Sequence, residues 1–317
     1  MLRSIVRLLR AHPRLTALFG AISIAFSGVL YEFSNTSPET ASFYRCFWGL
    51  PILLFAAYVE QGAGGRGRMD RRSMAIAAFA GVLFAGDLIF WHHTINLVGA
   101  GLATVLGNLQ VVVVAIAAWL LFGERPTGRT LIALPIILLG VAFIAGVFGG
   151  LGGTNFGTNP QLGVLLGFLT ALSYGGYLLV IRRISGARTA GPVAASTTST
   201  AVVALIVGFF LGTLDLTPGW ESMLWLILLG VSAQAFGYLF ISLSLPRLPA
   251  VVTSIILLAQ PVMSVALAMI ILHETPSPAQ LLGVVCVIGG IAFATVPLSR
   301  LRRRPSNSAS APAVGPG

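Results

Sequence analysis

The stretch that decides the fold is residues 98–146, VGAGLATVLGNLQVVVVAIAAWLLFGERPTGRTLIALPIILLGVAFIAG. Residues 248–296 align with it without a gap. Apolar stretches match easily by chance, but a glutamine and a Glu-x-Pro at one constant offset indicate a duplicated unit. The aligned pairs include Gln110 with Gln260, Glu124 with Glu274, Pro126 with Pro276, Ala100 with Ala250, Gly140 with Gly290, Phe143 with Phe293 and, upstream, Phe90 with Phe240.

The composition places the chain in a membrane. Of its 317 residues, 56% are hydrophobic and only 9% are charged, whereas a soluble domain carries roughly 25% charged residues. So few charges cannot build a water-facing surface, so lipid is the expected solvent and partner. The net charge of +10 comes from arginines in short clusters between apolar runs rather than along one face. Nucleic acid is therefore not an expected partner.

The apolar runs predict ten transmembrane helices. A helix that crosses the bilayer core needs about 20 apolar residues. The runs are long and unbroken rather than alternating, which favours helices over strands. They lie at residues 15–33, 40–59, 73–96, 100–122, 129–149, 161–181, 191–212, 222–245, 249–272 and 278–297.

The arginines predict the orientation of these helices. All except Arg45 fall in the two tails and in the loops that a ten-helix chain places on the same side as its tails. The loops on the opposite side carry acidic residues instead, namely Glu39, Asp215 and Glu221. By the positive-inside rule both termini are cytoplasmic. A miscounted helix would scramble this alternation, so the arginines also favour the count of ten.

Because each repeat has five helices, an odd number, the second must enter the bilayer from the side opposite to the first. The predicted fold class is thus an all-α membrane protein with ten transmembrane helices as a 5+5 inverted repeat. Inverted repeats mark transporters whose substrate site lies near the midplane between the repeats. Two halves of one design can rock between two packings of similar energy, which gives alternating access.

Two local patterns carry a resemblance to a known family. Residues 121–126 (LFGERP) are echoed by residues 272–276 (LHETP), and residues 41–45 (ASFYR) lie early in the second helix. With the ten helices and the repeat, the chain resembles the drug/metabolite transporter superfamily, EamA type, over about residues 14–297. The resemblance implies transport of amino acids, nucleotide sugars, drugs or other small metabolites, and it leans toward efflux. The second repeat has no arginine matching Arg45.

The predicted division of the chain follows from the repeat. It is a cytoplasmic tail at residues 1–14, a first EamA-like five-helix repeat at 15–149, an extracytoplasmic linker at 150–160, a second such repeat at 161–298 and a disordered cytoplasmic tail at 299–317.

Two charged residues within the helices are the first candidates for a site. Ionisable groups in a membrane span cost about 2.5–3.5 kcal/mol each on insertion scales and point to function. Asp87 lies about 15 Å from the outer end of its helix, and Arg45 about 9 Å, by helical rise. Asp87 is a candidate proton carrier or partner for a cationic group, and Arg45 a candidate partner for a carboxylate or phosphate. Alternatively, Arg45 snorkels or pairs with Asp87 or Glu32.

Polar residues supply further candidates. His92 and His93 point about 100° apart, so at most one faces a cavity, and His92 is a candidate proton relay with Asp87. Gln110 and Gln260 lie halfway along equivalent helices, and a substrate can satisfy their buried amides, as can hydrogen bonds between helices. Glu124 and Glu274 lie at helix ends before prolines, which favours a structural role.

Aromatic residues lie on the same helices. Trp48 follows Arg45 by three residues and Trp91 follows Asp87 by four, so each pair shares a helix face. With Tyr174 and Tyr177 they would suit a small zwitterion or an aromatic metabolite, while the alternative is an interfacial aromatic belt. The expected substrate-binding residues are Arg45, Trp48, Asp87, Trp91, Gln110, Tyr174, Tyr177 and Gln260.

The predicted function is secondary active transport of small metabolites, such as amino acids, by proton-coupled efflux across a prokaryotic plasma (inner) membrane. No Gly-x-x-x-x-Gly-Lys-Ser/Thr loop occurs in the sequence, so energy is expected from a gradient. No cofactor and no metal site are expected. The alternatives are a passive channel or facilitator and, less favoured, an intramembrane enzyme. The chain is expected to be a monomer or a homodimer.

Overall fold

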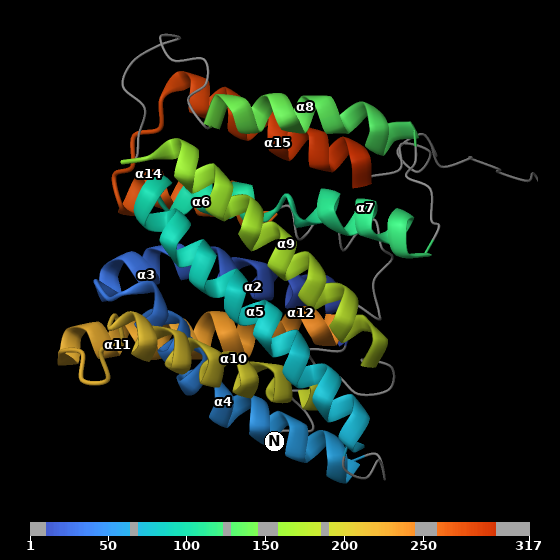
Figure 1. The fold of residues 1–317 in the computed structure, drawn as a ribbon, viewed down its shortest axis with the longest axis vertical. Helices are drawn as coiled ribbons and strands as arrows, with labels where there is room; N and C mark the ends of the chain where they lie inside the picture. Colours follow the sequence, from blue (N-terminus) through green and yellow to red (C-terminus); the bar gives the residue numbers. More distant parts are fainter. Residues whose placement is uncertain are drawn as a thin grey trace, which may run out of the picture.

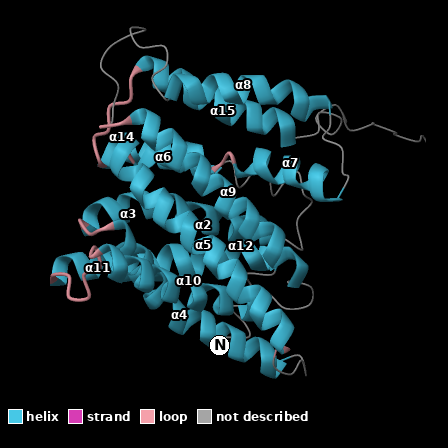
Figure 2. Ribbon diagram, viewed as in Figure 1, coloured by secondary structure: helices cyan, strands magenta, loops and turns pink. Residues whose placement is uncertain are grey.

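The computed structural model describes residues 11–63, 69–122, 128–144, 158–184, 190–244 and 259–295. Within these ranges every regular element is a helix and no residue is in a strand (Figure 2). The predicted all-α class is therefore confirmed for the described part of the chain. Some predicted features lie outside the described residues, namely the tails at 1–10 and 299–317, most of the linker, the start of the ninth helix at 249–258 and Glu124.

The helices lie where the apolar runs predict them. The first half contains α2 (Pro13–Ala25), α3 (Ser27–Ser34), α4 (Pro38–Ala63), α5 (Arg71–Val98), α6 (Ala100–Gly107), α7 (Gln110–Phe122) and α8 (Gly128–Ile144). The second half contains α9 (Pro160–Ile184), α10 (Ala190–Leu211), α11 (Trp220–Leu229), η1 (Gly230–Gly237), α12 (Tyr238–Ser244), α14 (Ala259–Ile271) and α15 (Pro278–Thr295). Among the described residues, six helical stretches are long and apolar enough to cross a membrane, and four shorter apolar helices occupy the other predicted ranges. Ten crossings stay a prediction.

Three predicted helices are not single regular α-helices. The run at 15–33 has a turn at Phe26 between α2 and α3. The run at 100–122 breaks after Gly107, where the side chain of Asn108 donates to the carbonyl of Thr104 at 2.8 Å. The N–H of Leu109 bonds three residues back to Leu106, so the turn tightens before α7 begins. Such side-chain bonds to the backbone compete with regular helix. The run at 222–245 contains the π-helical segment η1, a feature often found at functional sites.

Polar side chains are gathered inside the bundle and large apolar ones cover much of its outside. Arg45, Asp87, His92 and Gln234 are buried. Exposed apolar side chains include Phe209, Phe210, Leu138, Val285 and Ile270. Polar side chains are costly in contact with lipid, whereas apolar side chains are not. This distribution therefore suits a protein whose solvent is the bilayer.

The packing of the helices relates the two halves. α8 lies along α15 at one end of the molecule and α4 lies at the other end (Figure 1). α5 packs on α9. Their counterparts in the other repeat also pack on each other, because η1 and α12 both contact α2. α4 packs on α10 and on η1, α6 packs on α14, and α5 packs on α10. Exchanging each of these helices for its counterpart in the other half reproduces the same contacts, which fits a two-repeat layout.

Small residues allow the α8–α15 contact. A Cβ atom added to Gly283 would lie 2.6 Å from the carbonyl oxygen of Gly140, and one added to Gly140 would lie 2.7 Å from that of Gly283. The two backbones therefore touch at these glycines, as in other close helix pairs within membranes.

Replacing Gly283 with alanine is expected to destabilise the protein by about 1–3 kcal/mol, because the new methyl group forces the two backbones apart. Gly289→Ala on the same helix is the matched control, since no atom lies within 4 Å of the added Cβ. The control should be as stable as the wild type or more so. Thermal unfolding in detergent measures both. Equal melting temperatures for the two variants would contradict the close contact.

Candidate functional site

Arg45 lies in the interior of α4 and is held by residues of the second half. Its side chain is only 3% exposed. Its Nε donates to Oε1 of Gln234 in η1 at 3.3 Å, and Nε2 of Gln234 donates to the hydroxyl of Thr197 in α10 at 3.1 Å. The guanidinium carbon lies 5.6 Å from the centre of a ring of Trp91, a cation–π distance. The side chain of Arg45 thus extends from α4 toward α5 and η1, and Gln234 links it to α10.

Asp87 lies in α5, one turn before Trp91, and is 8% exposed. Within the described part of the chain its carboxylate makes no hydrogen bond and no salt bridge. Arg45 lies over the ring of Trp91, one turn after Asp87 on the same helix, but it forms no salt bridge with Asp87. The direct Arg45–Asp87 pair is therefore absent from this structure, and an exchange of partners on substrate binding stays a prediction.

Four aromatic rings gather next to Asp87. Phe84 stacks on Tyr177 with ring centres 4.8 Å apart, and Tyr174 stacks on Tyr177 at 5.8 Å. Tyr238 meets Phe84 edge to face at 5.3 Å. Phe84 lies three residues before Asp87 on α5, so the two side chains share a helix face. The structure thus brings the predicted residues Asp87, Tyr174 and Tyr177 into one neighbourhood.

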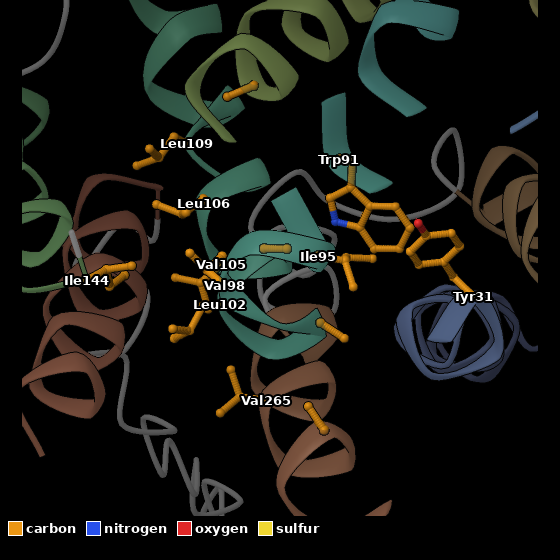
Figure 3. Close-up of a cluster of buried hydrophobic side chains, with 14 of the residues drawn as sticks. Tyr31, Trp91, Ile95, Val98, Leu102, Val105, Leu106, Leu109, Ile144 and Val265 are labelled. Atoms are coloured by element: carbon orange, nitrogen blue, oxygen red, sulfur yellow. The ribbon is translucent and has the colours of Figure 1, made fainter. Parts of the chain in front are cut away.

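His92 and His93 face different surroundings, as their spacing predicts. His92 is fully buried, its Nδ1 lies 2.9 Å from the hydroxyl of Ser42, and its ring centre is 4.3 Å from that of Tyr31. Its Nε2 is buried without a hydrogen-bond partner among the described residues. His93 is partly exposed and bonds the buried carboxylate of Glu39 at 2.9 Å. Figure 3 shows Trp91 and Tyr31 side by side at the edge of the central apolar cluster.

The two predicted glutamines occupy equivalent but separate places. Gln110 is the first residue of α7, and its Oε1 is buried without a partner in the described part of the chain. The hydroxyl of Thr170 in α9 is also buried without a partner there. Gln260 is the second residue of α14 and is half-buried. No hydrogen bond joins Gln110 to Gln260 among the described residues.

Trp48 has a different setting from the other predicted aromatics. Its indole N–H donates to the sulfur of Met223 in α11 at 3.4 Å, and its Cβ lies against Gly230. Its polar atom is therefore directed to the α11–η1 region.

Sequence reasoning missed four residues of this region, Gln234, Thr197, Ser42 and Glu39. Gln234 accepts a hydrogen bond from Arg45 and donates one to Thr197. Glu39 was expected in a loop, but it lies in the first turn of α4 and is fully buried against His93. A polar side chain within an apolar run indicates a candidate site residue, and this pattern could have identified Gln234 as it identified Gln110 and Gln260.

A cavity of about 750 Å³ opens near the predicted outer ends of the helices. Its polar lining includes Glu32, Asn96, Tyr31 and Glu274. Glu274 follows α14 and accepts hydrogen bonds from the N–H groups of Ala100 at 2.6 Å and Gly101 at 3.4 Å. Burial raises the pKa of the Glu274 carboxyl above its usual range, although these two bonds act in the opposite direction. Glu274 thus caps the N-terminus of α6, which agrees with a structural role.

Replacing Glu274 with alanine is expected to destabilise the protein by about 1–2 kcal/mol, as the loss of other helix caps does. Glu274→Gln keeps an acceptor oxygen for Ala100 and should lose less. Thermal unfolding in detergent compares them. An alanine variant as stable as the wild type would show that the cap contributes nothing.

No group of three His, Cys, Asp or Glu side chains with a metal-binding arrangement occurs among the described residues. The site consists instead of two opposite charges, buried amides and aromatic rings at the junction of two similar helical halves. That construction, in a chain with apolar helices facing outward, defines a multi-pass membrane protein with a polar interior.

The comparisons with known proteins name the family. A family profile described as "EamA-like transporter family" matches residues 14–146 and again residues 161–296. The chain therefore belongs to the EamA-like transporter family, whose members are transporters and not enzymes. The predicted resemblance is confirmed, and the two matched regions correspond to the two predicted repeats.

Solved structures agree on the fold. Twenty-two chains from solved structures match this chain. One, titled "Crystal structure of protein", is 19% identical, covers 89% of this chain and 98% of its own, and aligns with a TM-score of 0.63. At this identity the likeness shows the fold alone. No curated protein matches the chain.

Proposed function

We propose that this protein is a secondary active transporter of small zwitterionic metabolites, such as amino acids, and that it works as a proton-coupled exporter. The proposed architecture is ten transmembrane helices in a 5+5 inverted repeat. The proposed location is a prokaryotic inner membrane, with both termini in the cytoplasm. The two halves rock about a site near the midplane, which exposes it to each side in turn.

One observation carries this proposal. Arg45 and Asp87 are opposite charges buried inside the bundle at 3% and 8% exposure, with no salt bridge between them. The guanidinium group of Arg45 lies over Trp91, one turn after Asp87 on α5. Isolated buried charges are costly, so each requires a partner. A zwitterion supplies both partners at once, its carboxylate for the fork of Arg45 and its ammonium group for Asp87. In this proposed arrangement the rings of Trp91, Tyr174 and Tyr177 face the rest of the substrate, which favours a substrate with an aromatic side chain.

Proton coupling is assigned to Asp87. A carboxylate that binds the ammonium group of the substrate in one state can take up a proton once the substrate has left. The carrier then returns with Asp87 protonated, and the proton is released inside when the ammonium group of the next substrate binds, because an opposite charge favours the ionised carboxylate. One proton thus enters for each substrate molecule exported. His92 is the proposed relay toward the outer side, because it is buried and its Nε2 has no hydrogen-bond partner in the described part of the chain.

The test is transport by purified protein in proteoliposomes. A panel of amino acids and small metabolites, L-phenylalanine among them, is offered with and without a pH gradient. Saturable uptake, counterflow of labelled L-phenylalanine and a response to the gradient are the expected results. Uptake that rises linearly with concentration and shows no counterflow would favour a passive channel. No uptake of any zwitterion would overturn the proposed substrate class.

A further inference from the structure

The contact between α4 and η1 depends on two glycines. A Cβ atom on Gly49 would lie 2.8 Å from Cγ of Gln234, and one on Gly230 would lie 2.8 Å from the carbonyl oxygen of Arg45. The two backbones therefore approach each other at the level of Arg45. This approach lets the side chain of Gln234, which is fully buried, reach the guanidinium group.

The orientation of the Gln234 amide is determined by its two partners. Arg45 offers only donors, so it requires the amide oxygen, and the amide nitrogen is then left for the oxygen of Thr197. Thr197 is fully buried, so water does not compete for this position. The hydrogen-bond chain Thr197–Gln234–Arg45 thus holds Nε of Arg45. Among the described residues no hydrogen bond occupies the two terminal nitrogens, which remain for a bidentate contact with an anionic group.

The first repeat has no glutamine at the position equivalent to Gln234. At the offset that pairs Phe90 with Phe240, the residue opposite Gln234 is Phe84, a member of the aromatic group beside Asp87. The half that lacks the arginine therefore supplies the residue that holds it. The π-helical segment η1 departs from regular helix at this same place.

We infer that Gln234 is a positioning residue that fixes Arg45 for the carboxylate of the substrate and so sets the preference for substrates with an anionic group. This inference rests on the proposed function, because it takes Arg45 as the carboxylate partner. Gln234 itself does not touch the substrate. It acts through the direction of the guanidinium group, so its loss affects recognition of the carboxylate more than transport in general.

The experiment compares L-phenylalanine with L-phenylalaninamide, which lacks the carboxylate, in proteoliposome transport. Gln234→Leu is expected to raise KM for phenylalanine on the order of tenfold, as loss of one hydrogen bond to a charged group does, with little change in the maximal rate. KM for phenylalaninamide should stay the same. Thr197→Val should shift the KM ratio in the same direction by less, and Thr197→Ser, which keeps the hydroxyl, should restore it.

The outcomes separate the inference from the proposed function. If Arg45→Lys changes the KM ratio but Gln234→Leu and Thr197→Val do not, the inference fails and the function of Arg45 stands. If the variants lower the maximal rate equally for both compounds, Gln234 is only structural and the inference also fails. If Arg45→Lys leaves the ratio unchanged, or the wild type transports no zwitterion of the panel, the proposed function itself fails. If Gln234→Leu does not fold, the comparison of Thr197→Val with Thr197→Ser still tests whether Gln234 positions Arg45.

Discussion

Replacing Arg45 with alanine is expected to reduce the affinity for a zwitterionic substrate on the order of 100-fold, because truncating one partner of a buried charge pair costs about 2–5 kcal/mol. The loss should exceed that of any other single substitution in the site. Arg45 is almost fully buried and has only one hydrogen bond within the described part of the chain, to Gln234. Nothing else in that part offers a guanidinium group beside Asp87. Uptake of L-phenylalanine by proteoliposomes measures the effect.

Two variants sharpen this test. Arg45→Lys keeps the charge but loses the planar fork, so it should recover only part of the affinity. Arg72→Ala, at the exposed start of α5, removes a positive charge outside the site and should leave affinity unchanged. An Arg45→Ala protein that folds and binds the substrate as tightly as the wild type would refute the assignment of Arg45 to the carboxylate.

Replacing Asp87 with asparagine is expected to abolish uptake driven by a pH gradient. For one proton per substrate, a gradient of one pH unit is worth about 1.4 kcal/mol, which is tenfold in accumulation. Asparagine cannot carry the proton, so the variant should lose this factor. Because asparagine keeps an acceptor oxygen, weak exchange of substrate across the membrane should remain. Counterflow and gradient-driven uptake, measured side by side, distinguish the two effects.

The matched control is Asp70→Asn on the same helix. Asp70 caps the start of α5 by accepting a hydrogen bond from the N–H of Ser73 at 3.1 Å, and asparagine can do the same. This variant should respond to the gradient as the wild type does. If Asp87→Asn also responds fully, the carboxylate is structural and the proton must travel by another group. His92, which the same assay can test as His92→Gln, is the next candidate.

The sequence determined the class of fold by composition and periodicity. Apolar runs of about 20 residues with few charges permit only helices in lipid, because every backbone group must be satisfied within its own segment. The constant offset between Gln110 and Gln260, together with the paired Glu-x-Pro motifs, located the two halves that the family profile also matches. Buried charge is costly, so Arg45 and Asp87 were visible as exceptions in their apolar runs.

The tertiary structure alone decided which groups face these charges. Arg45 lies 189 positions before Gln234, and no local pattern links them. Their contact depends on the close approach of α4 and η1 at Gly49 and Gly230, which is a property of packing between the halves. Likewise, Glu39 next to a helix start looked solvated in sequence, yet the fold buries it against His93. A sequence shows which residues are costly to bury, whereas only the packed helices show which partner offsets that cost.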